Sequence, residues 1–429
     1  MNKLKSIIFI VFIVLFSANS YASELLSKLE ALPGVVSVKE LETNKTFNEK
    51  YLIVFEQYLD PSIPEAGTFQ QRVFLSHKSD DAPVVFITEG YSADYAKSKN
   101  YVNELSQILD ANQICVEHRF FSESIPTGEI DWSYLTTSLA ASDHHIIRNA
   151  FKDLYTNKWV STGISKGGET CLLYQMYYPH DVDVTVAYVA PVATALEDGR
   201  HEPFINNLAT KKDRKRITKF QTEVLSRRET LLPMFKQYIS ISKLSFRIPV
   251  EEVFEYCVLE YSFAFWQWVG DTEKIPTKKS KDDKFFQHLM AVSGPDYFSI
   301  EGSDPIFPFL YQAARELGYY GYETETLSDY LEIESAEGYF NKIFIPSDMK
   351  IDFYAQTSKD LHKFLNEKAK KTIMIYGEYD PWTAAAPDVS TNKNIIKVIK
   401  PTGTHATRIL NLPEADKEMV LNTLNGWMK

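Results

Sequence analysis

The sequence predicts an α/β fold whose mostly parallel central sheet is interrupted by an inserted helical cap. Two observations lead to this prediction. Within 23–195, short apolar runs alternate with stretches of helical spacing, which is typical of parallel strands covered by helices on both faces. Within 196–346 the alternation stops and the chain becomes helix-rich and aromatic, and strand patterns return within 347–429. We therefore expect one α/β domain in two parts with a cap between them.

The first 22 residues have the three parts of a secretory signal peptide. Two lysines precede an apolar run from Ile7 to Phe16, and a polar stretch then ends at Ala22. The apolar run is shorter than the roughly 20 residues that cross a bilayer. We therefore expect cleavage after Ala22 and a secreted or periplasmic protein without a stable membrane anchor.

The composition excludes several classes of partner. A formal net charge of -11 argues against a nucleic-acid partner, because phosphate binding needs a basic surface. Three cysteines allow at most one internal disulfide, so the fold does not depend on a disulfide framework. The chain has no Cys-x-x-Cys, no His-Glu-x-x-His and no acidic calcium loop, so no metal site or cofactor is expected. The sequence leaves the oligomeric state open.

The individual elements follow from periodicity. Alternating runs at 51–60 and 68–77 predict antiparallel strands at a sheet edge. The elements expected next are strand 82–91, helix 101–110, strand 113–121, helix 139–155, strand 158–162, helix 167–179 and strand 183–192. After the cap, strand patterns within 371–382 and 392–409 and a closing helix at 414–428 complete the fold.

Residues 163–168 read Gly-Ile-Ser-Lys-Gly-Gly, between a predicted strand and a predicted helix. A serine between two glycines at such a turn is typical of the nucleophile of an α/β-hydrolase. The glycines relieve crowding around the turn, and the helix N-terminus points at the developing oxyanion. The motif predicts Ser165 as a nucleophile, and a glycine-rich turn that only caps a helix is the alternative.

A serine nucleophile needs a base, and the base needs an acid that orients it. Asp380 and His405 each follow a predicted strand, and they complete the order serine, acid, histidine of the α/β-hydrolases. We therefore predict an α/β-hydrolase fold with a Ser165-Asp380-His405 triad. An Asp-Pro turn that ends a strand and an exposed loop histidine are the alternatives. Weaker candidate bases lie within or at the end of helices: His144, His145 and His180.

Two further stretches follow predicted central strands, TEGY at 88–91 and EHRFFSES at 117–124. The loop after an early strand supplies the second oxyanion donor in α/β-hydrolases. We therefore expect the backbone N–H of Tyr91 to act beside that of Lys166.

The same two stretches contain candidate carboxylates for a positively charged substrate group. Glu89 or Glu117 would hold such a group through charge-assisted hydrogen bonds. For the Glu-His-Arg run that begins at Glu117, a buried ion-paired cluster that only fixes loops is an equal alternative.

Several of these stretches together resemble the secreted tripeptidyl aminopeptidases of the serine type, the prolyl tripeptidyl aminopeptidases. This family is related to the lysosomal prolyl carboxypeptidases. The resemblance extends from about residue 50 to the C-terminus and depends on FITEGY, EHRFFSES, STGISKGGET, EDGRHEPF, YGEYDPWTA and GTHATRI.

The resemblance implies an exopeptidase that releases short peptides, typically tripeptides, from free N-termini, with proline preferred at the cleaved bond. Position by position, Ser165 matches the nucleophile, Asp380 the acid and His405 the base. It also implies a helical cap over the active site, which matches the inserted region. By closing most of the cleft, such a cap would leave room for a chain end and exclude folded protein. A carboxylate at a fixed distance from Ser165 would then count the residues released.

Aromatic residues are expected to hold the proline ring. Trp382 and the cap tryptophans Trp266 and Trp268 would line this pocket. Plain core packing is the alternative for the cap pair, and support of the Asp380 loop is the alternative for Trp382. Phe120 and Phe121 stand where relatives often have tyrosine and glycine, so we expect Phe121 to alter the shape of the pocket.

Two other functions fit the same sequence. An esterase or lipase would use the same triad and be indifferent to a free amine, because the fold does not fix the substrate. A secreted binding protein could retain the fold without the chemistry, although the presence of all three triad residues argues against it.

Overall fold

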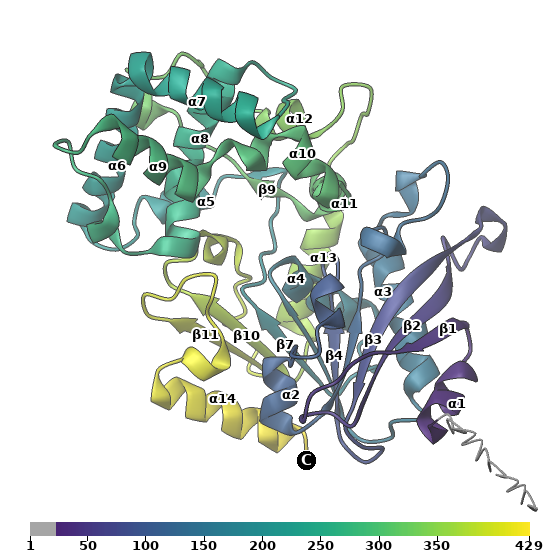
Figure 1. Ribbon diagram of the computed structural model, residues 1–429. Helices are drawn as coiled ribbons and strands as arrows, with labels where there is room; N and C mark the ends of the chain where they lie inside the picture. Colours follow the sequence, from purple (N-terminus) through teal and green to yellow (C-terminus); the bar gives the residue numbers. More distant parts are fainter. Residues whose placement is uncertain (1–22) are drawn as a thin grey trace, which may run out of the picture.

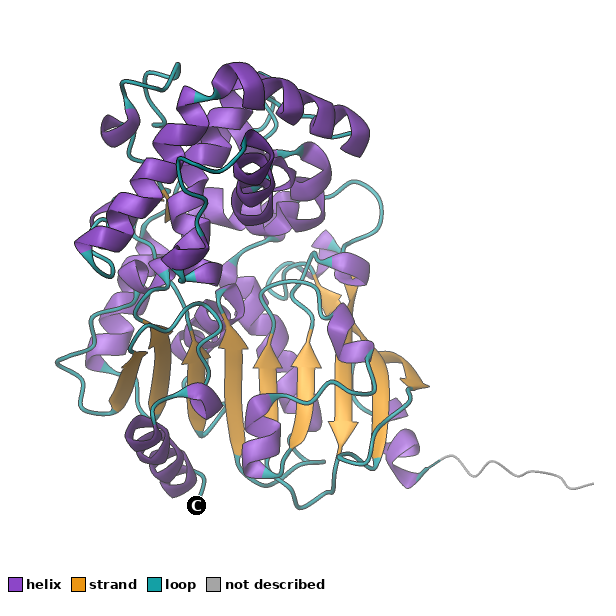
Figure 2. Ribbon diagram, turned by 60° about the vertical axis from the view of Figure 1, so that its left-hand side comes forward, coloured by secondary structure: helices purple, strands orange, loops and turns teal. Residues whose placement is uncertain are grey.

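The computed structural model describes residues 23–429, so the predicted signal peptide, 1–22, lies outside the described residues. The chain forms a large sheet with helices on both faces and a helical cap at one end of the sheet (Figure 1). Figure 2 shows the arrowheads of the parallel strands pointing toward this cap. The predicted α/β fold with an inserted helical region is confirmed, and the boundaries at 196 and 346 stay predictions.

The large sheet has nine strands in the order β1-β2-β3-β5-β4-β6-β7-β10-β11. β1, β2, β3 and β5 pair antiparallel in succession, and every other pair is parallel. The bounds are β1 Val35–Glu40, β2 Glu49–Tyr58, β3 Thr68–His77, β4 Val84–Thr88, β5 Asn112–Val116, β6 Trp159–Ile164, β7 Val184–Tyr188, β10 Thr372–Gly377 and β11 Ile395–Lys400. The predicted antiparallel edge is therefore confirmed. β1 was not predicted, because none of its side chains is buried and its sequence lacks a clear apolar alternation.

Helices cover the sheet on both faces, which is why its central strands are apolar throughout. In β4, Val85 and Ile87 pack on the side of α2 and α14, while Val84 and Phe86 pack on the opposite side. The helices of the first face are α2 Glu104–Leu109 and α14 Glu414–Trp427. Those of the second face are α1 Glu24–Glu30, α3 Thr137–Phe151, α4 Lys166–Tyr177 and α13 Gln356–Glu367.

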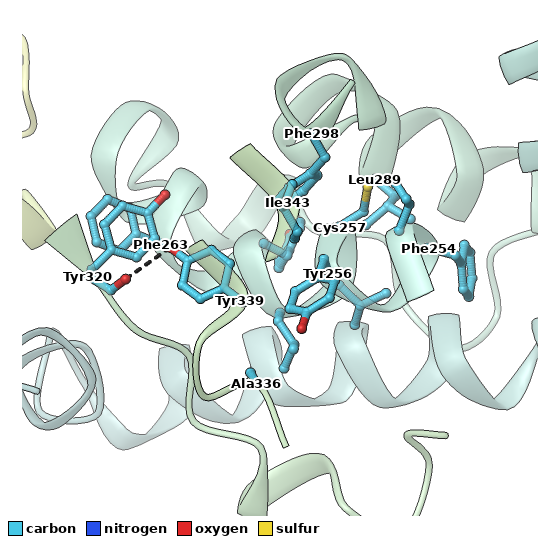
Figure 3. Close-up of a cluster of buried hydrophobic side chains, with 14 of the residues drawn as sticks. Phe254, Tyr256, Cys257, Phe263, Leu289, Phe298, Tyr320, Ala336, Tyr339 and Ile343 are labelled. Atoms are coloured by element: carbon cyan, nitrogen blue, oxygen red, sulfur yellow. Dashed lines mark hydrogen bonds between the residues drawn. The ribbon is translucent and has the colours of Figure 1, made fainter. Parts of the chain in front are cut away.

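The cap has a hydrophobic core of its own. This cluster runs from Leu208 to Ile345 and includes Trp382 from the α/β part. Figure 3 shows its aromatic character, with Tyr339 hydrogen-bonded to the Tyr320 carbonyl at 2.9 Å. The cap helices are α5 His201–Ile205, α6 Lys211–Ser226, α7 Arg228–Ser242, α8 Val250–Ala264, α9 Asp282–Ser293, α10 Ile300–Ser303, α11 Phe307–Gln312 and α12 Tyr339–Phe344.

One small parallel ribbon in the cap was not predicted. It pairs β8 Glu197–Asp198 with β9 Tyr319–Tyr320, two segments of two residues each. Strands this short leave no periodic signal, and only the folded cap brings them together. The three cysteines are buried and unpaired within the described chain. Among residues 23–429, no helix has both the length and the apolar character needed to cross a membrane.

Candidate active site

Ser165 lies on a strained turn between β6 and α4. Its backbone has φ 57° and ψ -124°, a conformation that is costly for a residue with a side chain and that clusters at functional sites. The Ser165 N–H donates to the Tyr188 carbonyl at 2.9 Å, and the Ser165 carbonyl accepts from the Glu169 N–H at 2.9 Å. These bonds hold the partly exposed serine side chain at the N-terminus of α4.

Glycines allow three backbone segments to meet at this turn. A Cβ atom at Gly163 would lie 2.0 Å from the Gly167 carbonyl oxygen, and one at Gly90 would lie 2.6 Å from the Gly167 nitrogen. β6, the start of α4 and the loop after β4 therefore pack backbone to backbone. Side chains at these positions would push the loop away from the serine turn.

His405 and Asp380 form a buried pair on the loops after β11 and β10. Nδ1 of His405 lies 2.7 Å from Oδ2 of Asp380, whose side chain is fully buried. Oδ1 of Asp380 accepts from the Trp382 N–H at 3.2 Å. The carboxylate favours the histidine tautomer with its proton on Nδ1, which leaves Nε2 free to accept a proton.

Ser165 and His405 line the same cavity, with a volume of about 670 Å³. This size lies within the usual range for ligand pockets. The hydrogen bonds of the described residues include none between the Ser165 hydroxyl and His405. Contacts between nucleophile and base are often looser without substrate. The structure thus brings all three predicted triad residues to one end of the sheet.

Two backbone N–H groups beside Ser165 have no acceptor within the described part of the chain. One belongs to Tyr91 and the other to Lys166. Lys166 is the first residue of α4, and the N–H groups of the first helical turn have no acceptor within the helix. Nζ of Lys166 donates to the Gly90 carbonyl at 2.7 Å, and this carbonyl shares a peptide group with the Tyr91 N–H. Lys166 therefore polarises and orients the peptide that carries the second N–H.

The Lys166 ammonium is buried against the rings of Tyr91 and Phe121. Burial lowers the pKa of Lys166 to about 7, although three neighbouring glutamates favour its charged form. Phe121 does not line the cavity itself. It contacts the cavity-lining ring of Tyr91 edge-on at 5.7 Å, so its effect on the pocket is transmitted through that ring.

The two predicted substrate carboxylates have different surroundings. Glu89 lines the cavity and accepts a hydrogen bond from the Tyr95 hydroxyl. Desolvation raises the pKa of Glu89 to about 7, opposed by the Tyr95 bond, the Gly90 N–H and the charge of Lys166.

Glu117 is fully buried and does not line the cavity. It forms an ion pair with Arg72, accepts from the Ser124 hydroxyl at 2.6 Å and accepts from the Ala93 N–H at 2.9 Å. These contacts correspond to the structural alternative, a buried ion-paired cluster that fixes loops.

The three tryptophans predicted to line the substrate pocket do not all face the cavity. Trp382 and Trp268 line the cavity, and the Trp268 ring contacts the His405 imidazole edge-on with centroids 5.2 Å apart. Trp266 is 1% exposed, belongs to the cap core and lines a different, smaller cavity. Core packing therefore describes Trp266, while the other two face the cavity of Ser165.

The sequence reasoning missed Glu260, which lines the same cavity from α8. Its signal was a lone acidic residue between Leu259 and Tyr261 on a helix whose other residues from 253 to 264 are mostly buried. That pattern also fits a buried structural ion pair such as the one Glu255 forms with Arg228. The sequence alone therefore does not show which of Glu255 and Glu260 lines the cavity and which forms a structural ion pair.

A serine on a strand-to-helix turn, followed by an aspartate and a histidine on the loops after the last two strands of a mostly parallel sheet, is the defining arrangement of the α/β-hydrolases. By this topology the chain is an α/β-hydrolase with an inserted helical cap. The model of one family within this class, PS-10 peptidase S37, matches residues 18–420. The chain belongs to this family and is a serine peptidase.

The chain is similar to two individual relatives and to one solved structure. A prolyl tri/tetrapeptidyl aminopeptidase of Streptomyces mobaraensis is 29% identical over 414 residues, which cover 94% of this chain and 85% of the relative. The lysosomal Pro-X carboxypeptidase of Bos taurus is 23% identical over 207 residues, covering 44% of this chain and 41% of the relative. Among solved structures, a proline iminopeptidase of Mycobacterium smegmatis superimposes with a TM-score of 0.42 at 13% identity, covering 91% of this chain and 99% of that one.

The Gly163→Ala variant tests the backbone packing at the serine turn. We expect it to lower the midpoint of urea unfolding and to abolish peptidase activity, because the new Cβ overlaps the Gly167 carbonyl. Gly426→Ala, a helical glycine with nothing within 4 Å of the added Cβ, is the control. It should be neutral or stabilising by up to about 1 kcal/mol. An active, stable Gly163→Ala protein would contradict the packing described.

The Glu117→Gln variant tests whether this carboxylate fixes loops. Removing the buried partner of Arg72 should cost about 3 kcal/mol of unfolding free energy. The matched control is Glu123→Gln, which also loses an Arg72 contact but at a carboxylate that is 65% exposed, and should cost less than about 1 kcal/mol. A rise in KM at unchanged stability for Glu117→Gln would instead indicate a substrate ligand.

Proposed function

We propose that the protein is an exported serine exopeptidase that releases short peptides, tripeptides by preference, from free N-termini, with proline favoured at the cleaved bond. The main support is one cavity that contains Ser165 and His405 together with carboxylates in a largely aromatic lining. Such a lining suits a peptide with a positive end and an apolar ring. The printed name of the Streptomyces mobaraensis relative supports the same specificity.

In the proposed mechanism, His405 accepts the proton of the Ser165 hydroxyl while its oxygen attacks the scissile carbonyl. Asp380 stabilises the imidazolium that forms. The resulting oxyanion accepts hydrogen bonds from the N–H groups of Tyr91 and Lys166, at the positive end of α4. His405 then protonates the leaving amine, and a water molecule, activated by the same histidine, hydrolyses the acyl-enzyme.

Substrate binding is proposed to use the remaining cavity residues. The aromatic rings of Trp382 and Trp268 would hold the proline, because flat aromatic faces pack well on a pyrrolidine ring. Glu89, beside the oxyanion loop, would contribute to the acidic character of the cavity. We assign no substrate-binding role to Glu117, because its carboxylate already forms an ion pair with Arg72.

Export is part of the proposal and depends on the signal peptide predicted within residues 1–22. The expected mature chain begins at Ser23, which caps α1 by accepting a hydrogen bond from the Leu26 N–H at 3.0 Å. Cleavage after Ala22 would therefore leave this helix start intact.

Hydrolysis of Ala-Ala-Pro linked to a chromogenic amine tests the proposed function. The wild type should cleave the peptide with a free N-terminus and not the N-acetylated peptide, because only the former has a terminal ammonium group. Ser165→Ala should lower kcat by on the order of 10⁴-fold or more. Cleavage of both peptides would indicate an endopeptidase, and cleavage of neither, with turnover of acyl esters, would indicate an esterase.

The Lys166→Met variant tests the polarised oxyanion peptide. At pH 6 the wild-type lysine is charged, so its removal should lower kcat by about tenfold with little change in KM. Because the pKa of Lys166 is lowered to about 7, the wild type loses this charge as the pH rises through 7. The ratio of wild-type to variant kcat should therefore fall between pH 6 and pH 8.5. A pH-independent ratio would contradict this role, and Lys152→Met, at an exposed lysine, is the control.

A further inference from the structure

Glu260 is a cap carboxylate buried at the wall of the Ser165 cavity. It lies on α8, is 7% exposed and lines the cavity from the cap side. Its Oε2 accepts hydrogen bonds from the hydroxyls of Tyr320 at 2.9 Å and Tyr322 at 2.7 Å. Within residues 23–429, Oε1 has no hydrogen-bond partner. One oxygen is thus fixed by the cap, and the other is free to bind a ligand.

No cation compensates the charge of Glu260. Among the described residues, no lysine, arginine or histidine lies within ion-pair distance of it. Burial raises the pKa of Glu260 to about 7, and the only opposing influences are the two tyrosine hydroxyls. A buried carboxylate without a cation is costly, so a positively charged ligand would be bound favourably at this position.

The surroundings of Glu260 also favour a cation. The ring of its partner Tyr320 stacks on Phe263, as Figure 3 shows. It meets Trp382 edge-on at 5.3 Å, and the rings of Tyr297, Tyr319 and Trp382 line the same cavity as Glu260. Aromatic faces attract ammonium groups through their negative π-face. A carboxylate beside several aromatic rings is therefore a suitable site for a primary or secondary ammonium.

Glu89 is less suited to the same role. Its charge is already stabilised by Lys166, whereas no cation influences Glu260. Glu89 also directly precedes Gly90 and Tyr91, the loop next to Ser165. An extended chain advances about 3.3 Å per residue, so the N-terminus of an oligopeptide lies well away from the bond that is cleaved. The ligand of the terminal ammonium group is therefore expected away from the loop that carries Glu89.

We infer that Glu260, held by Tyr320 and Tyr322, is the anchor for the α-ammonium group of the substrate. This inference rests on the proposed exopeptidase function and assigns its N-terminal recognition to one carboxylate in the cap. The cap then does more than narrow the cavity, because it supplies the charge that selects a free chain end. The position of Glu260 relative to Ser165 fixes the length of peptide released.

The pH dependence of substrate binding follows from the same site. The charge of Glu260 acts on Tyr297, Tyr319, Tyr320, Tyr322, Tyr339 and Cys257, and burial raises the pKa of each, so all are neutral near pH 7. Glu89, His405 and Arg408 line the same cavity, but the pKa of Glu260 responds only to burial and to the two tyrosine hydroxyls. Glu260 is ionised above its pKa of about 7 and loses its charge below it. The KM for an amine-terminated peptide should therefore rise as the pH falls from 8 to 6.

The deciding experiment compares Glu260→Gln with the wild type on the free and acetylated Ala-Ala-Pro substrates. At pH 8 we expect KM for the free peptide to rise by about 10- to 100-fold, the loss of a charged hydrogen bond, with a smaller change in kcat. The preference for the free peptide should shrink by a similar factor. The rise in KM between pH 8 and pH 6 should also weaken.

Two further variants make the result specific. Glu252→Gln removes the same charge from the same helix outside the cavity, where Glu252 pairs with Lys342, and should leave KM unchanged. Glu89→Gln removes the other cavity carboxylate, so it serves to compare specificity and is not an activity control; it should retain the preference for the free peptide. If Glu89→Gln abolishes this preference and Glu260→Gln does not, the assignment to Glu260 is overturned.

The outcomes separate this inference from the proposed function. A wild type that does not prefer the free peptide contradicts the exopeptidase function itself. A wild type with this preference and a Glu260→Gln variant that keeps it contradict only the anchor. Labelling of Ser165 by a fluorophosphonate does not need an amine, so an unchanged labelling rate shows that the variant is folded. If Glu260→Gln fails to label, Tyr322→Phe decides, with a several-fold rise in KM expected and an unchanged KM contradicting the anchor.

Discussion

The contact of the α4 N-terminus with the loop after β4 is the constraint on which the candidate active site depends. It leaves no space for a Cβ atom at Gly90, and the packing of β6 on the same turn of α4 leaves none at Gly163. Ser165, between β6 and α4, has a positive φ. Tyr91 directly follows Gly90 and Lys166 is the first residue of α4, so this contact brings both residues beside the serine turn. The buried Lys166 side chain closes the same contact by bonding the Gly90 carbonyl. A single packing arrangement thus sets the position of the serine and of both candidate oxyanion donors.

The cap is tied directly to the loops that carry the other candidate catalytic residues. The His405 N–H donates to the Gln267 carbonyl in the cap at 3.0 Å, and Trp382, two residues after Asp380, belongs to the hydrophobic cluster of the cap. The segment of Gln267 is a π-helical turn, a geometry that is rare and frequent at functional sites. Changes in cap packing are therefore expected to reach the acid and base loops through these contacts.

Charge compensation distinguishes the buried carboxylates of this protein. Glu117 and Glu260 are both almost inaccessible to solvent, yet Glu117 is paired with Arg72 and Glu260 has only tyrosine hydroxyls. The charge of a buried carboxylate that is paired with an arginine is already compensated, so it needs no ligand. A buried carboxylate without a cation keeps an uncompensated negative charge. The cavity beside Glu260 can admit a positively charged substrate group that compensates this charge. This contrast is the physical basis for assigning Glu260, and not Glu117, to substrate recognition.

The sequence by itself determined the fold class, nearly all the strands of the large sheet, and the loops on which Ser165, Asp380 and His405 lie. These features follow from local periodicity and from the rule that sites form at the carboxyl ends of parallel strands, so short segments contain the necessary information. The solvent-exposed β1 was missed for the same reason, since an unburied strand leaves no periodic signal. Only the tertiary structure decided which carboxylates face the cavity, because whether Glu117 or Glu260 has a cation beside it depends on residues far apart in the chain. Pairing energies of buried charges are set by distances in the folded protein, and a linear sequence does not contain them directly.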